Sequence, residues 1–79
     1  MPAKIRVLAS WAARYGVGDD VCRPFLFKSL TKAQRGKLIR AVNAHAGEIH
    51  AWLDGFPSGK MTTEAEAFLY LAEGVEEIR

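Results

Sequence analysis

The sequence lacks several features that define common functional classes. It has one cysteine, Cys22, so no intramolecular disulfide can form, and the absence of such a staple is typical of a reducing, intracellular setting. It has no run of about 18 apolar residues, so no membrane-spanning helix is expected. The alternation of apolar and polar residues that marks a half-buried strand is also missing. We therefore expect a cytoplasmic, all-α protein that does not span a membrane.

Acidic residues are scarce in the first 45 positions. This part has nine lysines and arginines but only Asp19 and Asp20, a net charge of +7. Residues 46–79 have seven acidic residues against Lys60 and Arg79, a net charge of −5, so the near-neutral total of +2 conceals two opposed blocks. Such blocks either pair inside the folded chain or face a charged partner.

No arrangement of residues typical of an enzyme is present. His45 and His50 are five positions apart, about 140° around a helix, whereas two metal-binding imidazoles on one helix face are four apart. Cys22 has no histidine in its own segment, and Gly16 and Gly18 do not follow the strand that precedes a phosphate-binding loop. We predict a non-enzymatic chain with no metal and no cofactor. His45 is expected to be a buried histidine bonded to a neighbour.

Helical periodicity is what the sequence does contain. The predicted helices cover about residues 3–15, 24–29 (a short one), 32–54 and 64–78. Capping boxes, in which a threonine precedes Gln or Glu by three positions, open the two long helices at Thr31 and Thr63. Gly16 stands where a left-handed C-terminal cap of the first helix is expected. Residues 25–27 form either this short helix, begun by Pro24, or an irregular segment across the core, and in both cases Phe25 and Phe27 are expected to be buried.

The two long helices are joined by about nine residues, which favours an antiparallel pair. We therefore predict a single helical domain over residues 1–79, a small three- to four-helix bundle built on an antiparallel helical hairpin. With the bend near Ser58, Arg40 would lie opposite Glu76 and Glu77, so that part of the charge asymmetry is internal. Each exposed pair of this kind contributes only about 0–1 kcal/mol.

Two charged surfaces remain unpaired in this arrangement. One is a basic edge around Arg23, and the other is a side of the last helix on which Tyr70 lies among glutamates. Tyrosine is common in protein interfaces, so an exposed tyrosine beside carboxylates suits a basic partner. We predict a small protein-binding module that docks on a larger partner or self-associates as a homo-oligomer. Its predicted partner-binding residues are Glu66, Tyr70, Glu73, Glu77, Arg23, Lys28, Lys32 and Arg35.

Residues 38–55 support an alternative. The run LIRAVNA at 38–44, with Asn43 at a turn position, then Ile49 and the run WLDG, resembles the helix-turn-helix of repressor-type phage regulators. The resemblance implies a DNA-binding regulator that uses residues 38–55. The apolar spacing, however, continues without a phase break, which favours one continuous helix. The second helix of the motif would present Glu48, His50, Ala51 and Asp54 and no Lys or Arg. Nucleic acid is therefore the less favoured partner.

Overall fold

The computed structural model describes residues 1–57 and 59–78, and it is built from helices. In chain order they are the 3-10 helix η1 (Ala3–Leu8) and the α-helices α1 (Ala9–Tyr15), α2 (Cys22–Lys28), α3 (Lys32–Ala44), α4 (Ala46–Asp54) and α5 (Thr63–Ile78). No strand occurs in the described residues, so the predicted all-α class is confirmed. In the same part of the chain, no helix has the length and apolar character needed to cross a membrane.

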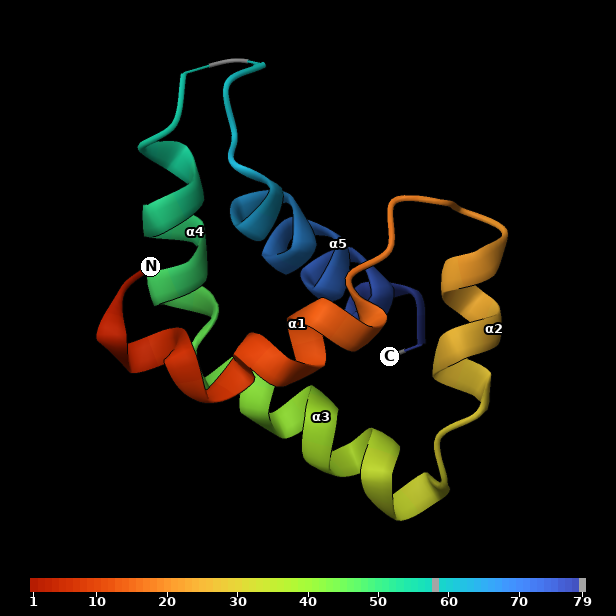
Figure 1. Cartoon of the computed structure of the whole chain (residues 1–79). Coiled ribbons are helices and arrows are strands. Elements are labelled where there is room, and N and C mark those ends of the chain that lie inside the picture. Colours follow the sequence, from red (N-terminus) through yellow and green to blue (C-terminus); the bar gives the residue numbers. More distant parts are fainter. Residues whose placement is uncertain (58, 79) are drawn as a thin grey trace.

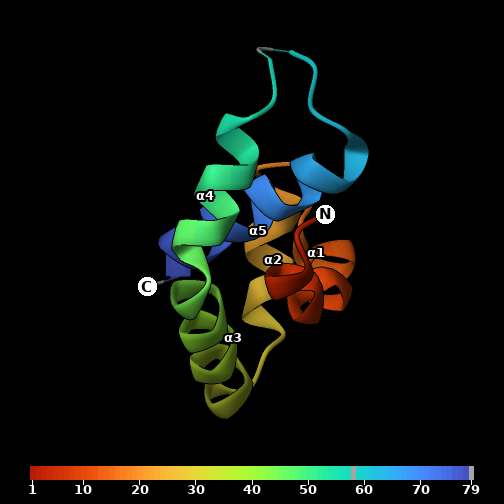
Figure 2. The ribbon, with the colours of Figure 1, turned by 90° about the vertical axis from the view of Figure 1, so that its left-hand side faces the viewer.

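α5 is the central element of the fold. The helices α1, α2, α3 and α4 all pack against it, and α1 does so most extensively. Figure 1 shows α4 running roughly opposite to α5 but crossing it obliquely, and Figure 2 shows α3 and α4 along one side of the molecule with η1 and α1 along the other. The last helix is therefore shared by four neighbours instead of pairing along its length with one long helix.

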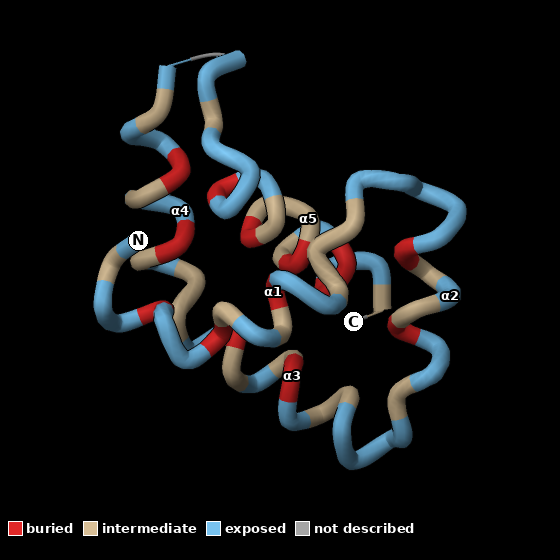
Figure 3. Tube along the Cα trace, viewed as in Figure 1, coloured by how far each residue is buried: buried red, intermediate tan, exposed pale blue. Residues whose placement is uncertain are grey.

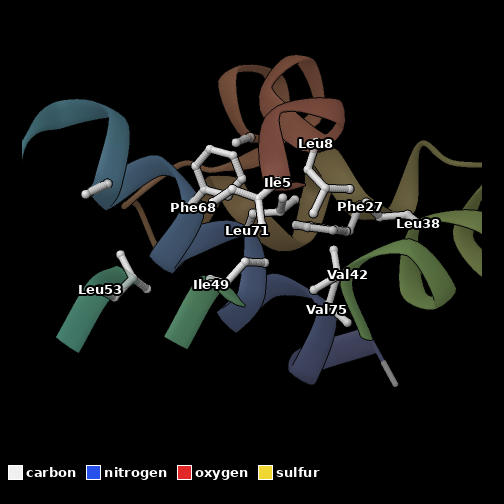
Figure 4. Close-up of a cluster of buried hydrophobic side chains, with 12 residues drawn as sticks. Ile5, Leu8, Phe27, Leu38, Val42, Ile49, Leu53, Phe68, Leu71 and Val75 are labelled. Carbon is white, nitrogen blue, oxygen red and sulfur yellow. The ribbon is translucent and has the colours of Figure 1, made fainter. Parts of the chain in front are cut away.

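The core is one cluster to which every helix contributes, as the burial map shows (Figure 3). Phe27 and Phe68 are its largest side chains and are fully buried. Ten core side chains are labelled in Figure 4: Ile5, Leu8, Phe27, Leu38, Val42, Ile49, Leu53, Phe68, Leu71 and Val75. Full burial of one such side chain stabilises the fold by about 1.5–3 kcal/mol. Phe25 was expected in the core, but it is 68% exposed.

The predicted helix over residues 32–54 is divided at His45. The backbone of His45, with φ −113° and ψ 11°, leaves the helical region, and α3 and α4 meet there at an angle (Figure 1). Its N–H donates to the Val42 carbonyl at 3.2 Å, an i−3 bond that tightens the last turn of α3. The predicted continuous helix is therefore wrong. A break of one residue hardly changes the phase of the apolar residues, so periodicity could not reveal it.

His45 also differs from its expected role. Its side chain is half-buried, and Nδ1 is buried with no hydrogen-bond partner in the described residues. The expectation of a buried histidine bonded to a neighbour is therefore not met for this nitrogen. The residue occupies the bend itself, as the C-terminal cap of α3 and the N-terminal cap of α4.

The helix starts follow the predicted capping chemistry with one shift. Thr31 N–H donates to Gln34 Oε1 at 2.9 Å and Gln34 N–H donates to Thr31 Oγ1 at 3.1 Å, so the capping box of α3 is confirmed. At α5 the side-chain cap comes from Thr62 and not from the predicted Thr63, because Ala65 N–H donates to Thr62 Oγ1 at 3.1 Å. Two adjacent threonines offer the same chemistry one residue apart.

Two glycines let other helices approach α5 closely. Gly16 follows α1 with φ −80° and ψ 64°, which is not the predicted left-handed conformation. A Cβ at this position would overlap the Ala67 carbonyl of α5. Likewise, a Cβ at Gly74 would overlap the Phe27 ring of α2. Gly16 and Gly74 thus set how closely α1 and α2 lie against α5.

Candidate protein-binding site

Arg23, which was predicted to bind a partner, is a buried cation. Its side chain is only 2% exposed. Arg23 and Phe27 are four residues apart in α2, so both side chains lie on the helix face that packs against α5. Pro24 does not disturb this helix, since it stands in the first turn, where a missing N–H breaks no helical hydrogen bond.

The guanidinium of Arg23 bonds to groups from two segments, the loop between α1 and α2 and the helix α5. Nε donates to Glu77 Oε1 at 2.9 Å, Nη1 donates to the Val17 carbonyl at 2.8 Å, and Nη2 donates to Asp20 Oδ1 at 2.7 Å. Nη2 is also 3.7 Å from Glu73 Oε2. The hydrogen bond to Glu77 is the main cause that raises the pKa of Arg23, against the opposing effect of burial. The residue therefore remains a cation that ties α2 and the loop before it to α5.

Tyr70 belongs to the same assembly. The Cζ atom of Arg23 lies 5.7 Å from the centroid of the Tyr70 ring, within the range of a cation–π contact. A Cβ at Gly18 would be only 3.0 Å from Tyr70 Cε2, so the ring also packs closely on the backbone of the loop. Tyr70 is consequently half-buried and held between α5 and the loop that follows α1.

The structure therefore joins residues that the sequence analysis assigned to two separate surfaces. Arg23, expected on an accessible basic edge, lies inside and contacts Tyr70, Glu73 and Glu77. Glu77 pairs with Arg23 and not with the predicted Arg40. Both corrections have one cause. The loop between α1 and α2 brings Arg23 to α5, and the path of an irregular loop cannot be predicted from a periodic pattern of apolar residues.

The remaining basic residues do not form one surface. Lys28 and Lys32 are exposed on either side of the short connection from α2 to α3. Lys28 Nζ lies 5.8 Å from the centroid of the Phe25 ring. Arg35 is half-buried, and its Nε is buried without a hydrogen-bond partner in the described part of the chain. Of the predicted basic edge, Lys28 and Lys32 keep fully accessible charges.

An open groove of about 640 Å³ lies between α1 and α5. Its lining combines small residues with two glutamates and includes Phe68 and the predicted partner-binding residues Glu66 and Tyr70. The lining residues are Met1, Ala9, Ala12, Ala13, Gly16, Gly18, Thr63, Glu64, Glu66, Ala67, Phe68 and Tyr70. Ala12 and Phe68 are buried, whereas Glu64 and Glu66 are exposed. The groove thus combines apolar contact surface with negative charge.

A second open groove, of about 370 Å³, lies on α5 beside α3 and α4. Its apolar lining is Val42, Ala46, Ile49, Leu53, Leu69, Ala72 and Val75, and its polar lining is Asn43, His50, Glu73 and Glu76. Of the predicted partner-binding residues only Glu73 lines it, and this carboxylate also contacts Arg23.

The negative charge of both grooves comes from glutamates of α5. This helix, Thr63–Ile78, contains five glutamates and no lysine or arginine. A carboxylate of the first groove, that of Glu64, is 3.9 Å from the Met1 ammonium. A surface lined by charge of one sign attracts ligands of the opposite sign and favours their correct orientation. Both grooves are therefore suited to a basic ligand.

The small residues of the α1–α5 groove were missed by the sequence analysis. Ala9, Ala12, Ala13 and Gly16 recur at helical spacing, and this was a usable signal, because small residues let another helix come close. Gly18 gave no signal, since its role depends on where Tyr70 lies after folding.

The break at His45 does not reproduce the turn of a helix-turn-helix. That turn has about three to four residues, whereas α3 and α4 are separated by one. Asn43, expected at the turn position of that motif, lies within α3, and no non-glycine residue in the described chain has a positive φ. The described residues also contain no group of three or more His, Cys, Asp or Glu side chains that could hold a metal ion.

These features define a small all-α domain whose central helix is flanked by two open grooves with acidic side chains. No protein-family model matches the chain, and no curated protein and no solved structure matches it. The functional interpretation therefore rests on the geometry and charge of the grooves.

Proposed function

We propose that this chain is a non-enzymatic protein-binding module that docks on a larger partner by taking a basic helix of that partner into the α1–α5 groove. The observation that carries this proposal is the lining of the groove, which combines small residues and the buried Phe68 with the exposed carboxylates of Glu64 and Glu66. Small residues let the backbone of an incoming helix approach closely, and the carboxylates attract its lysines or arginines.

Tyr70 supports the proposal because it is positioned before a partner arrives. Its ring packs on Gly18 and lies beside the Arg23 guanidinium, so the ring loses little conformational freedom on binding. A tyrosine held in this way is a favourable contact at an interface.

The α1–α5 groove is preferred over the second groove for two reasons. It is larger, about 640 Å³ against about 370 Å³, and its lining includes the rings of Phe68 and Tyr70, whereas the lining residues of the second groove include no Phe, Tyr or Trp.

The test uses a synthetic helical peptide of Lys, Ala and Leu with one apolar face, and a twin in which Glu replaces Lys. Fluorescence anisotropy at low salt should show binding of the basic peptide only. Glu66→Lys should weaken that binding by about tenfold, equivalent to ~1.4 kcal/mol. Asp54→Lys is the matched control, because it makes the same charge change at an exposed site on α4 outside the groove, and it should leave the affinity within about twofold.

Two further variants measure the contribution of the Tyr70 ring to peptide binding separately from that of the carboxylates. Tyr70→Ala should weaken peptide binding, whereas Tyr70→Phe, which keeps the ring against Gly18, should not. If Glu66→Lys and Asp54→Lys weaken binding equally, the peptide responds only to net charge and the groove is not the docking site.

A DNA-binding role for residues 38–55 is the second candidate function, and the observation that favours it is the break at His45. In addition, α3 carries four basic residues and no carboxylate. Against it stand the missing turn and the acidic residues of α4. This role predicts duplex binding that weakens with salt and when Arg35 and Arg40 are neutralised. Failure to bind any duplex at low salt would remove it.

A further inference from the structure

α2 presents an apolar face that stays exposed in the described part of the chain. Its inner face, with Arg23 and Phe27, is buried against α5. On the outer side, Val21 is 69% exposed at the start of the helix and Phe25 is 68% exposed one turn later. Single exposed apolar residues are common, but two large ones at i and i+4 form a continuous patch.

Charged residues stand at both ends of this patch. The exposed carboxylates of Asp19 and Asp20 precede Val21, and the exposed ammonium of Lys28 follows Phe25 in the last turn of the helix. Along the chain the order is therefore negative, apolar, apolar, positive. Such an order is complementary to itself only when a second helix runs in the opposite direction.

We propose that the outer face of α2 docks on the same face of a second copy of this chain, with the two α2 helices antiparallel and related by a two-fold axis. In that arrangement Val21 of each copy lies against Phe25 of the other. Lys28 of each copy lies at the acidic end of the other, and symmetry makes this contact twice. The patch is a different surface from the α1–α5 groove, so a dimer and a docked partner are compatible.

The orientation of this face is fixed before the second copy arrives. Asp19 Oδ1 accepts hydrogen bonds from Val21 N–H at 2.8 Å and Cys22 N–H at 3.1 Å, which fixes the start of α2. Arg23 then holds the inner side of the helix to Glu77 of α5. A preformed surface loses less entropy on association. Because one short helix offers far less than the roughly 1,200 Å² of a stable interface, the dimer is expected to be weak and concentration-dependent.

Cys22 provides a reporter of this geometry. It is an exposed free thiol adjacent to Val21, and in the antiparallel pair the two Cys22 side chains lie on the same side of the two helices. Diamide should therefore link two copies through Cys22: two thiols lose two protons and two electrons and form one disulfide, while diamide is reduced to the hydrazine. The rate of linkage reports how often the two α2 faces meet.

The experiment combines sedimentation equilibrium of the reduced chain, from about 10 µM to about 1 mM, with the initial rate of diamide linkage. Phe25→Glu should lower both the association constant and the linkage rate by about tenfold or more. Val7→Glu is the matched control, because Val7 is 72% exposed on η1, and it should change neither quantity. Lys28→Glu should weaken association, whereas Lys60→Glu in the loop before α5 should not.

Three results would overturn the inference. The first is a chain that stays monomeric at the highest concentration and links no faster than Phe25→Glu. The second is a dimer that survives Phe25→Glu, because its interface would then lie elsewhere. The third is an equal loss with Val7→Glu, which would indicate non-specific association of apolar surface. Each leaves the peptide test of the α1–α5 groove unaffected, so failure of this inference and failure of the proposed function are distinguishable.

Discussion

Arg23 is the residue at which the opposed charges of the sequence meet. It comes from the basic first part, and Glu73 and Glu77 come from the acidic second part. A buried guanidinium is tolerated here because its N–H groups are directed at carboxylates and a backbone carbonyl. Internal pairing of the two blocks was predicted, but with Arg40 as the cation. Apolar spacing places Arg40 on a long helix and gives no information about a side chain next to an irregular loop.

Replacement of Arg23 measures how much its contacts with Glu73 and Glu77 contribute to the free energy of unfolding. Arg23→Ala should lower the free energy of unfolding by about 2–4 kcal/mol, less than for a fully buried pair because the carboxylates are partly exposed. Arg40→Ala is the control and should change it by no more than about 0.5 kcal/mol, since Arg40 is exposed. Urea unfolding of both variants gives the two values. If Arg40→Ala lowers the free energy of unfolding more than Arg23→Ala does, Arg40 is the cation that pairs with the glutamates of α5, as in the predicted hairpin.

Asp19 makes the stability of the fold depend on pH in the acidic range. The backbone N–H groups of Cys22 and Val21 lower the pKa of Asp19 below its ordinary value of 3.8. Because the folded pKa is below the unfolded one, the stabilisation is complete above the unfolded value and is lost as the pH falls through the folded value. A carboxyl carbon NMR titration should find the pKa of Asp19 below 3.8, and Asp19→Ala should make stability fall less steeply with acid in this range. A pKa at or above 3.8 would contradict this cap.

At the scale of elements, glycine decides how closely helices lie on α5. Gly74 faces the Phe27 ring, and glycine at this point lets α2 contact the C-terminal half of α5. Gly47 in α4 has nothing within 4 Å of where a Cβ would stand. The two positions are therefore a matched pair, both in a helix, one packed and one open.

The pair predicts opposite effects of the same substitution. Gly74→Ala should destabilise the fold by about 1–3 kcal/mol, because overpacking against Phe27 outweighs the better helix propensity of alanine. Gly47→Ala should stabilise it by up to about 1 kcal/mol. Thermal unfolding of both variants tests this. Stabilisation by Gly74→Ala would show that α2 does not rest on α5 through Phe27.

The elements differ in how well the sequence predicts them. The apolar faces of α3, α4 and α5 and the capping box at Thr31 follow from local spacing, so they were predictable. The bend at His45 was not, because it preserves the apolar phase. The outward position of Phe25 was not either, since the run Phe-Leu-Phe has no alternation that would distinguish its faces.

At the scale of the whole molecule, the candidate site was predictable only in part. Glu66 and Tyr70 were identified from their position on one side of α5, and the structure adds the small residues of α1 that turn this side into a groove. That addition depends on which helix packs beside α5, a long-range property that no local pattern contains. Arg23 was misplaced for the same reason.

The central claim is that the α1–α5 groove is the docking surface for a basic helix. The most direct measurement is a 1H–15N NMR titration of the whole chain with the Lys, Ala and Leu peptide. We expect the amide shifts to concentrate at Ala13, Gly16 and Ala67 and to leave Ile49 and Ala72 of the second groove unchanged. Shifts concentrated in the second groove, spread evenly over the glutamates of α5, or absent at saturating peptide would contradict the claim.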